Sequence, residues 1–194
     1  MIEIKESNLT IKQIIEPLEI FTSISTKNKY EIEDQNSKPL YYAYEVSNFF
    51  MNQLLNKHRP LKMVIVDNDK NIQMTIEKAF HFLKARYMVK DNKENIIGYI
   101  RQRRWFITKS FDICDKDDMA YYTCTAKFPH LWTFKIFQQE MHVGTILKKW
   151  SGIGKEAFTD ADNFQINYAN IKEHKHLVLA AAFAIDLIVF ERRK

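Results

Sequence analysis

The chain has 194 residues, of which 46% are hydrophobic and 27% charged, a mixture that supports one folded domain with its own core. Four glycines and four prolines exclude a low-complexity chain, and two cysteines, Cys114 and Cys124, exclude a disulfide framework or a zinc pattern. The net charge of +5 favours an anionic partner, such as acidic lipid headgroups or nucleic acid, but a surface of solvated lysines explains it equally well.

The N-terminal residues are charged from Glu3 onward, so they do not form a signal peptide, and Ile2 replaces the glycine that myristoylation requires. We therefore expect an intracellular protein, either cytoplasmic or peripheral on the inner face of a membrane. We expect residues 1–17 to be a lead-in segment, either a short helix or an extended stretch, because Pro17 interrupts a run of apolar residues at helical spacing. Residues 18–21 predict the first strand.

From Tyr30 onward, short alternating runs are joined by polar turns. The turns open at Asp34, Asp67, Asp91, Asp115 and Gln138, and the last four of these positions are 24, 24 and 23 residues apart. Aspartate suits such turns because its side chain bonds the local backbone, and alternation around a polar turn predicts a hairpin. Five hairpins, residues 18–21 and residues 164–168 predict about twelve antiparallel strands, and closure into a barrel would remove their edges.

Residues 46–60, between the first two hairpins, have apolar side chains at helical spacing and predict a short helical insertion. Its apolar residues suit either the core or a surface patch for a partner. Nowhere does the sequence contain a phosphate-binding glycine loop, a nucleophile elbow or a set of metal ligands. A catalytic constellation is therefore not predicted, and a metabolic enzyme is not expected.

Two basic segments each contain a tryptophan. Cations beside an indole suit an acidic membrane interface, where the ring lies at headgroup depth, and they equally suit a nucleic-acid backbone with base stacking. The structural alternative is that strand alternation turns the cations outward while the tryptophan packs. The candidate lipid-binding or anion-binding residues are Arg101, Arg103, Arg104, Trp105, Lys148, Lys149 and Trp150.

Asp160 and Asp162 are spaced like the first ligands of a calcium loop, in which oxygen ligands occupy alternate positions. Such a loop needs a glycine at its sixth position and a carboxylate at its twelfth, where this chain has Gln165 and Ile171. An acidic turn before a strand is the alternative. Ca²⁺ is the one cofactor that these residues suggest.

The last apolar stretch, residues 177–190, contains one charge, Asp186, and predicts a helix that is apolar on nearly every face. Such a helix is buried either in protein or in lipid. A bilayer core of ~30 Å needs about 20 apolar residues, so a core helix over residues 174–191 is expected, with lipid insertion as the alternative. Its expected core-facing residues are Leu179, Phe183, Leu187 and Phe190.

Several strings of this chain resemble the phospholipid scramblase family. The most specific are residues 144–153 (GTILKKWSGI), 156–164 (EAFTDADNF) and 182–191 (AFAIDLIVFE), and residues 19–22 and 28–32 add an N-terminal match. The resemblance runs from about residue 15 to residue 191. It implies a Tubby-like fold shared with LURP-one-related proteins, a closed barrel of twelve strands around a C-terminal helix.

The resemblance also implies calcium-dependent, energy-independent movement of phospholipids between leaflets. In this chain the family's calcium segment corresponds to residues 160–171, of which Asp160 and Asp162 match the pattern and the final acidic position does not. The family's basic segment, linked there to nuclear import, corresponds to residues 144–153. The family's proline-rich extension and palmitoylated cysteine cluster have no counterpart. We expect a minimal core-domain relative that binds acidic phospholipid, and a binding module for nucleic acid or protein is the alternative.

Overall fold

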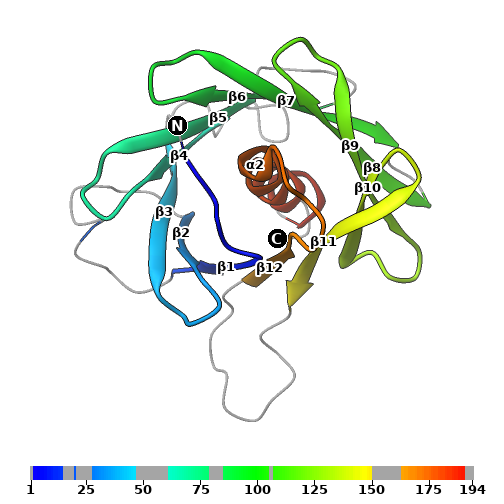
Figure 1. The fold of residues 1–194 in the computed structure, drawn as a ribbon, viewed down its shortest axis with the longest axis horizontal. Helices are drawn as coiled ribbons and strands as arrows, with labels where there is room; N and C mark the ends of the chain where they lie inside the picture. The colour runs from blue at the N-terminus through cyan, green and yellow to red at the C-terminus, as the bar shows by residue number, and fades with distance from the viewer. Residues whose placement is uncertain are drawn as a thin grey trace, which may run out of the picture.

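The computed structural model describes residues 2–14, 20, 28–46, 61–78, 85–104, 107–149 and 163–190. In this part of the chain, twelve antiparallel strands close into one barrel in sequence order, and β1 and β12 pair to complete the circle. A C-terminal helix lies inside the barrel, along its axis (Figure 1). The closed barrel around a central helix, which the sequence predicted, is confirmed.

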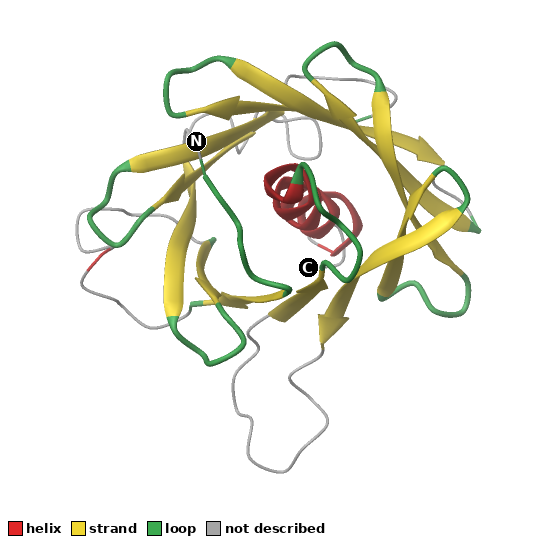
Figure 2. Ribbon diagram, viewed as in Figure 1, coloured by secondary structure: helices red, strands yellow, loops and turns green. Residues whose placement is uncertain are grey.

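The strands are β1 (Asn8–Gln13), β2 (Lys29–Glu33), β3 (Pro39–Val46), β4 (Leu61–Val66), β5 (Ile72–Lys78), β6 (Arg86–Asp91), β7 (Ile96–Arg104), β8 (Thr108–Asp115), β9 (Ala120–Lys127), β10 (Thr133–Gln138), β11 (Met141–Lys149) and β12 (Asn163–Asn167). The helix α2 (Lys175–Ile185) continues directly into a π-helical turn, η3 (Asp186–Phe190). Figure 2 shows the helix enclosed on all sides by strands.

The first strand differs from the sequence prediction. Residues 8–13 of the expected lead-in form β1, in which Leu9 and Ile11 face the core. Alternation over these six residues is short and is mixed with polar positions, so the helical spacing around Pro17 obscured it. The predicted strand at residues 18–21 and the predicted insertion at residues 46–60 lie almost entirely outside the described residues.

Four of the hairpin turns have the same geometry. In each, the opening aspartate accepts backbone hydrogen bonds through Oδ1 from the second and fourth residues after it, at 2.8–3.0 Å. The third residue after it has a positive φ of 60–65°. These aspartates are Asp34, Asp67, Asp91 and Asp115. The local bonds satisfy backbone donors that the strands leave unpaired, which is why the turns could be predicted from the sequence.

The helix α2 is buried from Leu177 to Ile185. The barrel wall comes close to it at Gly98 of β7, where a Cβ atom would lie 2.8 Å from the Leu177 side chain and 2.5 Å from the Cys114 carbonyl oxygen. Only glycine therefore fits at this position without displacing the helix or the neighbouring strand. Close packing of wall against helix leaves α2 no solvent-exposed face.

The two ends of the barrel differ, and we name them for their connections. The turn end carries the hairpin turns at residues 34–38, 67–71, 91–95, 115–119 and 138–141, and the N-terminal segment crosses it (Figure 1). The connection end is the opposite one, where β1 is joined to β2, β3 to β4, and so on around the barrel. The helix begins at the turn end, where Lys175 donates to the carbonyl oxygens of Lys5 and Glu6, and ends at the connection end.

Candidate functional site

The one charge in residues 177–190, Asp186, is paired inside the barrel. Asp186 lies where α2 ends, and its Oδ1 is 3.3 Å from the Nζ of Lys148, which projects inward from β11. The Tyr30 hydroxyl of β2 donates to Asp186 Oδ2 at 2.8 Å. The Lys148 ammonium also lies 5.1 Å from the centre of the Phe164 ring. One buried carboxylate therefore joins the helix to β2 and β11, the two strands that flank the β1–β12 pair.

Removing two charges from water is unfavourable, so a buried ion pair of this kind contributes little net stability over an apolar replacement. Loss of one partner is different, because the other charge then stays buried without compensation. The pair joins the C-terminal end of α2 to the inner face of β11. The helix changes from α to π geometry at Asp186, and such turns are frequent at functional sites.

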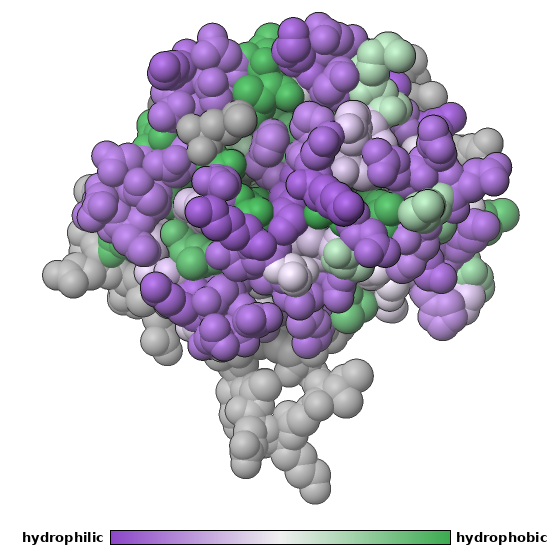
Figure 3. Space-filling model, viewed as in Figure 1, coloured by the Kyte–Doolittle hydropathy of each residue, from purple (hydrophilic) through white to green (hydrophobic). Residues whose placement is uncertain are grey.

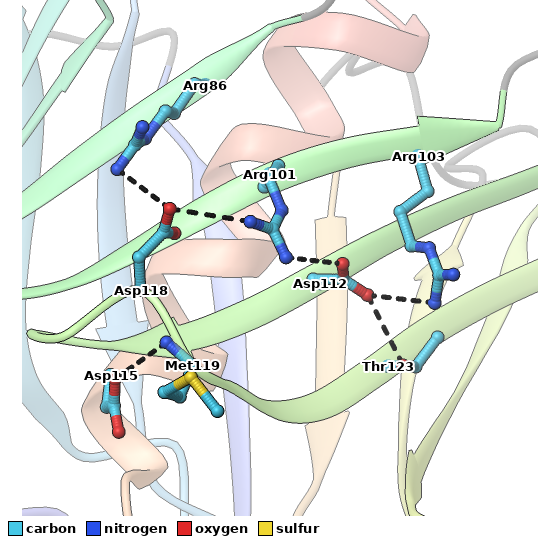
Figure 4. Close-up of polar contacts among 8 residues, drawn as sticks. All are labelled: Arg86, Arg101, Arg103, Asp112, Asp115, Asp118, Met119 and Thr123. Atoms are coloured by element: carbon cyan, nitrogen blue, oxygen red, sulfur yellow. Dashed lines mark hydrogen bonds and ion pairs between the residues drawn. The ribbon is translucent and has the colours of Figure 1, made fainter.

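A second charged cluster lies on the outer wall, over β6 to β9 (Figure 4). Asp112 is buried beneath the side chains of Arg101 and Arg103, with separations of 3.1 and 3.4 Å. Asp118, in the turn after β8, bridges Arg101 at 3.4 Å and Arg86 at 3.2 Å. The hydrogen bond to Asp112 raises the pKa of the Arg101 guanidinium. Three arginines are thus held in a row by two carboxylates.

The row retains part of its positive charge. Arg86, Arg101 and Arg103 outnumber the two carboxylates that they bridge, and all three guanidinium side chains remain accessible to solvent. Arg86 also stacks over the ring of Tyr99, 4.1 Å from its centre. The cluster is therefore a pre-organised cationic surface, able to accept an additional anion such as a phosphate group.

A row of exposed lysines continues this surface around the barrel. Lys127, Lys135 and Lys149 come from the neighbouring strands β9, β10 and β11, and strand alternation turns each of them outward. Within the described part of the chain none of the three forms an ion pair. Their charges are available to an anionic partner.

The residues predicted as one anion-binding group therefore separate in space. Arg101, Arg103 and Lys149 lie on the outer wall, whereas Lys148 points into the barrel and is not presented to a partner outside it. Trp105 and Trp150 lie outside the described residues, as do Asp160 and Asp162 of the predicted calcium segment, and the side chain of Arg104 is not described.

The predicted core-facing residues Leu179, Phe183 and Leu187 are buried against the barrel wall. The side chain of Phe190 lies outside the described set. Among the described residues no helix is long and apolar enough to span a bilayer. In the same part of the chain, no three histidine, cysteine or acidic side chains are placed to hold a metal ion.

Sequence reasoning missed the pairing of Lys148 with Asp186 and the role of Asp112. One signal was present, because a lone aspartate within an apolar helix requires a buried partner. The identity of that partner depends on strand register, which places Lys148 on the inner face together with Gly144 and Ile146. The lysine row was missed because Lys127 and Lys135 lie in segments without a basic cluster of their own.

The Scramblase family model matches residues 2–192, which include every strand and the central helix. The chain belongs to the scramblase family. It is 30% identical to phospholipid scramblase 1 of Mus musculus over 201 residues, covering 95% of this chain and 61% of the mouse protein. It is 27% identical to phospholipid scramblase 2 of Homo sapiens over 202 residues, covering 96% of this chain and 68% of the human protein. The scramblase domain described above thus spans about three fifths of the length of the mouse relative.

A solved structure of a protein from Arabidopsis thaliana has the same fold. It superimposes with a TM-score of 0.50 at 10% sequence identity, covering 97% of this chain and 94% of the plant protein. At this identity the similarity concerns the fold alone. The Tubby-like architecture expected from the sequence resemblance is confirmed.

Proposed function

We propose that this scramblase domain binds acidic phospholipid membranes and supports the movement of phospholipids between their leaflets. The observation that carries the proposal is family membership over the whole barrel and helix, with relatives named phospholipid scramblases. We further propose that the domain acts from the inner face of a membrane, as a peripheral protein.

The charge of the chain supports binding to acidic lipid. The net charge is +5, and exposed cations occupy neighbouring strands of the outer wall, whereas α2 has no exposed face. Lysine and arginine near an anionic bilayer each contribute about 1 kcal/mol to binding. The outer wall, rather than the central helix, is therefore the surface that meets lipid first.

Calcium dependence is part of the proposal and rests on Asp160 and Asp162, whose carboxylates are the oxygen ligands that Ca²⁺ prefers. Two carboxylates are few for such a site. A Ca²⁺ requirement that survives the change of both residues to alanine would place the ion elsewhere.

The test is reconstitution into vesicles that contain phosphatidylserine and a trace of fluorescent lipid, followed by dithionite quenching of the outer leaflet. Active protein increases the quenched fraction beyond one half, because lipid from the inner leaflet becomes accessible. Parallel samples contain Ca²⁺ or a chelator, and flotation of the same vesicles measures binding separately. Binding without excess quenching would limit the function to lipid binding, and absence of both would refute the proposal.

A further inference from the structure

The ionisable residues of the barrel are divided between its two ends. At the connection end, the three residues of each strand that lie nearest this end include twelve lysines or arginines and three glutamates, although two of the cations, Lys109 and Lys148, are buried. At the turn end, the five hairpin turns include nine aspartates or glutamates and four lysines, a net charge of −5. The chain as a whole carries +5, so the barrel is electrically polar along its axis.

The turn end is the face drawn in Figure 3, where hydrophilic residues cover most of the surface. Its carboxylates repel an anionic surface, and at physiological ionic strength the repulsion extends over about 8 Å. The strands between the two ends have five to nine residues and rise about 3.3 Å per residue. Two of the strand-end cations reach back to turn residues, since Arg86 bridges Asp118 and Lys62 lies 3.8 Å from Glu94. Among the described residues, no ion pair joins the remaining exposed cations Arg103, Lys127, Lys135 and Lys149 to a turn residue, so these four present a positive surface that the turn carboxylates do not neutralise.

An exposed apolar pair lies at the connection end. Ile107, before β8, is 78% exposed, and Phe128, after β9, is 71% exposed. The two are neighbours, because the Phe128 N–H donates to the Ile107 carbonyl oxygen at 3.2 Å. Lys127 precedes Phe128 directly and is exposed, and Arg103 lies on the adjacent strand β7. An apolar tip with cations around it suits a surface that is anionic outside and hydrocarbon beneath.

We propose that the barrel docks on acidic membranes through its connection end, with Ile107 and Phe128 inserted at headgroup depth and with Arg103, Lys127, Lys135 and Lys149 over the lipid phosphates. This orientation rests on the function proposed above, membrane binding, and specifies the surface that performs it. It also brings the helix terminus at Asp186, and the buried Lys148 that pairs with it, to the end of the barrel nearest the bilayer.

The apolar pair favours lipid over the other anionic partners. A nucleic-acid backbone offers phosphate to the cations but no hydrocarbon for an isoleucine side chain, whereas a bilayer interface offers both. The turn end supplies an internal comparison, since Met119 and Met141 are each 68% exposed but lie beside acidic turn residues. Large exposed apolar side chains thus occur at both ends, and the charge of their neighbours distinguishes the two ends.

The first test compares two variants with the same loss of charge. Lys127→Gln/Lys149→Gln removes two cations from the connection end, and Lys70→Gln/Lys93→Gln removes two exposed cations from the turn end. We expect the first variant to bind phosphatidylserine vesicles about 25-fold more weakly than wild type, at about fivefold per lysine. The second variant should bind as wild type within about twofold. The difference should shrink as salt rises.

The second test locates the inserted residue. Phe128→Cys and Met141→Cys are each labelled with an environment-sensitive fluorophore and mixed with the same vesicles. The native thiols should not react with the label, because both are buried. Burial raises the pKa of Cys114 to about 11 and raises that of Cys124 as well. We expect the label at position 128 to brighten and shift to the blue on binding, and the label at position 141 to stay unchanged.

The outcomes separate the inference from the function on which it rests. If wild type does not float with acidic vesicles, membrane binding itself is refuted. If wild type binds but the two charge variants weaken equally, or the label responds at position 141 instead of position 128, membrane binding stands and the connection-end orientation is refuted. If duplex DNA binds the wild-type protein more tightly than phosphatidylserine vesicles do, and displaces it from them, the same surface belongs to nucleic acid and the inference is also refuted.

Discussion

The polar residues at the two ends of the barrel have different roles. At the turn end, four aspartates satisfy the backbone of their own hairpins, and the turns are short and acidic. At the connection end, cations gather on the strand ends and polar side chains enter the barrel. One end sets the register of the sheet by local chemistry. The other end concentrates charge that folding alone does not require, which is typical of a surface with a partner.

The interior shows the same division. Near the turn end α2 packs through apolar side chains, such as Leu177 against Gly98. Near the connection end the inner face has a chain of polar contacts, in which Gln13 donates to Asn28 and Asn28 donates to Glu45, in addition to the Lys148–Asp186 pair. Buried polar groups hold the barrel together well only when every partner is present. The connection end is therefore the more sensitive to single substitutions.

The largest effect is expected from Lys148→Met, which removes the buried ammonium 3.3 Å from Asp186 Oδ1 and leaves the hydrogen bond from Tyr30 in place. We expect a loss of about 3 kcal/mol in the free energy of unfolding, measured by urea denaturation followed by circular dichroism. The control is Lys148→Met/Asp186→Leu, in which both charges are removed and most of the stability should return. A single variant as stable as wild type would show that the ion pair does not constrain the helix.

A smaller effect is expected at the turn end from His176, in the first turn of α2. Burial and the neighbouring His174 lower the pKa of the His176 imidazole to about 4. Because an unfolded histidine titrates near pH 6.5, the unfolded state binds the extra proton first, and stability falls as pH drops from about 6.5 toward 4. We expect this residue to lower the free energy of unfolding by about 2 kcal/mol between pH 7 and pH 5.

The measurement for His176 is urea denaturation of wild type and His176→Gln at both pH values. At pH 7 the variant is expected to be less stable than wild type. Between pH 7 and pH 5 its free energy of unfolding should fall by less than that of wild type. An equal pH response in the two proteins would assign the acid sensitivity to another group.

The smallest effect is expected from Asp91→Asn in the turn after β6. Hydrogen bonds from the Asn95 side chain, and from the backbone N–H groups of Asn95 and Lys93, lower the pKa of Asp91. Its contribution to stability is therefore present above about pH 4 and is lost as pH falls further. The melting temperature of the variant should be lower than that of wild type at pH 6, and the two melting temperatures should converge near pH 3. Asp69→Asn, which changes a carboxylate that does not accept the backbone bonds of its turn, is the control.

Much of the fold could be predicted because its causes are local. Each aspartate turn depends on bonds within five residues, and strand alternation is visible in runs such as β6 and β10. The site could be predicted only in part. Arg101 and Arg103 were expected on the surface and are there, whereas nothing near them in the sequence identifies Asp112 as their shared partner, since it lies on the next strand.

The acidic turns, the alternation of most strands and the burial of the last helix were predictable from the sequence, because they follow from side-chain chemistry within a few residues. Barrel register, in contrast, places Lys148 in the interior and Lys149 on the surface, and it brings Asp186 to Tyr30 across 156 positions of the chain. The same register makes Ile107 and Phe128 neighbours at the connection end. These relationships depend on register and closure of the barrel, and therefore on the sum of many contacts distant in sequence.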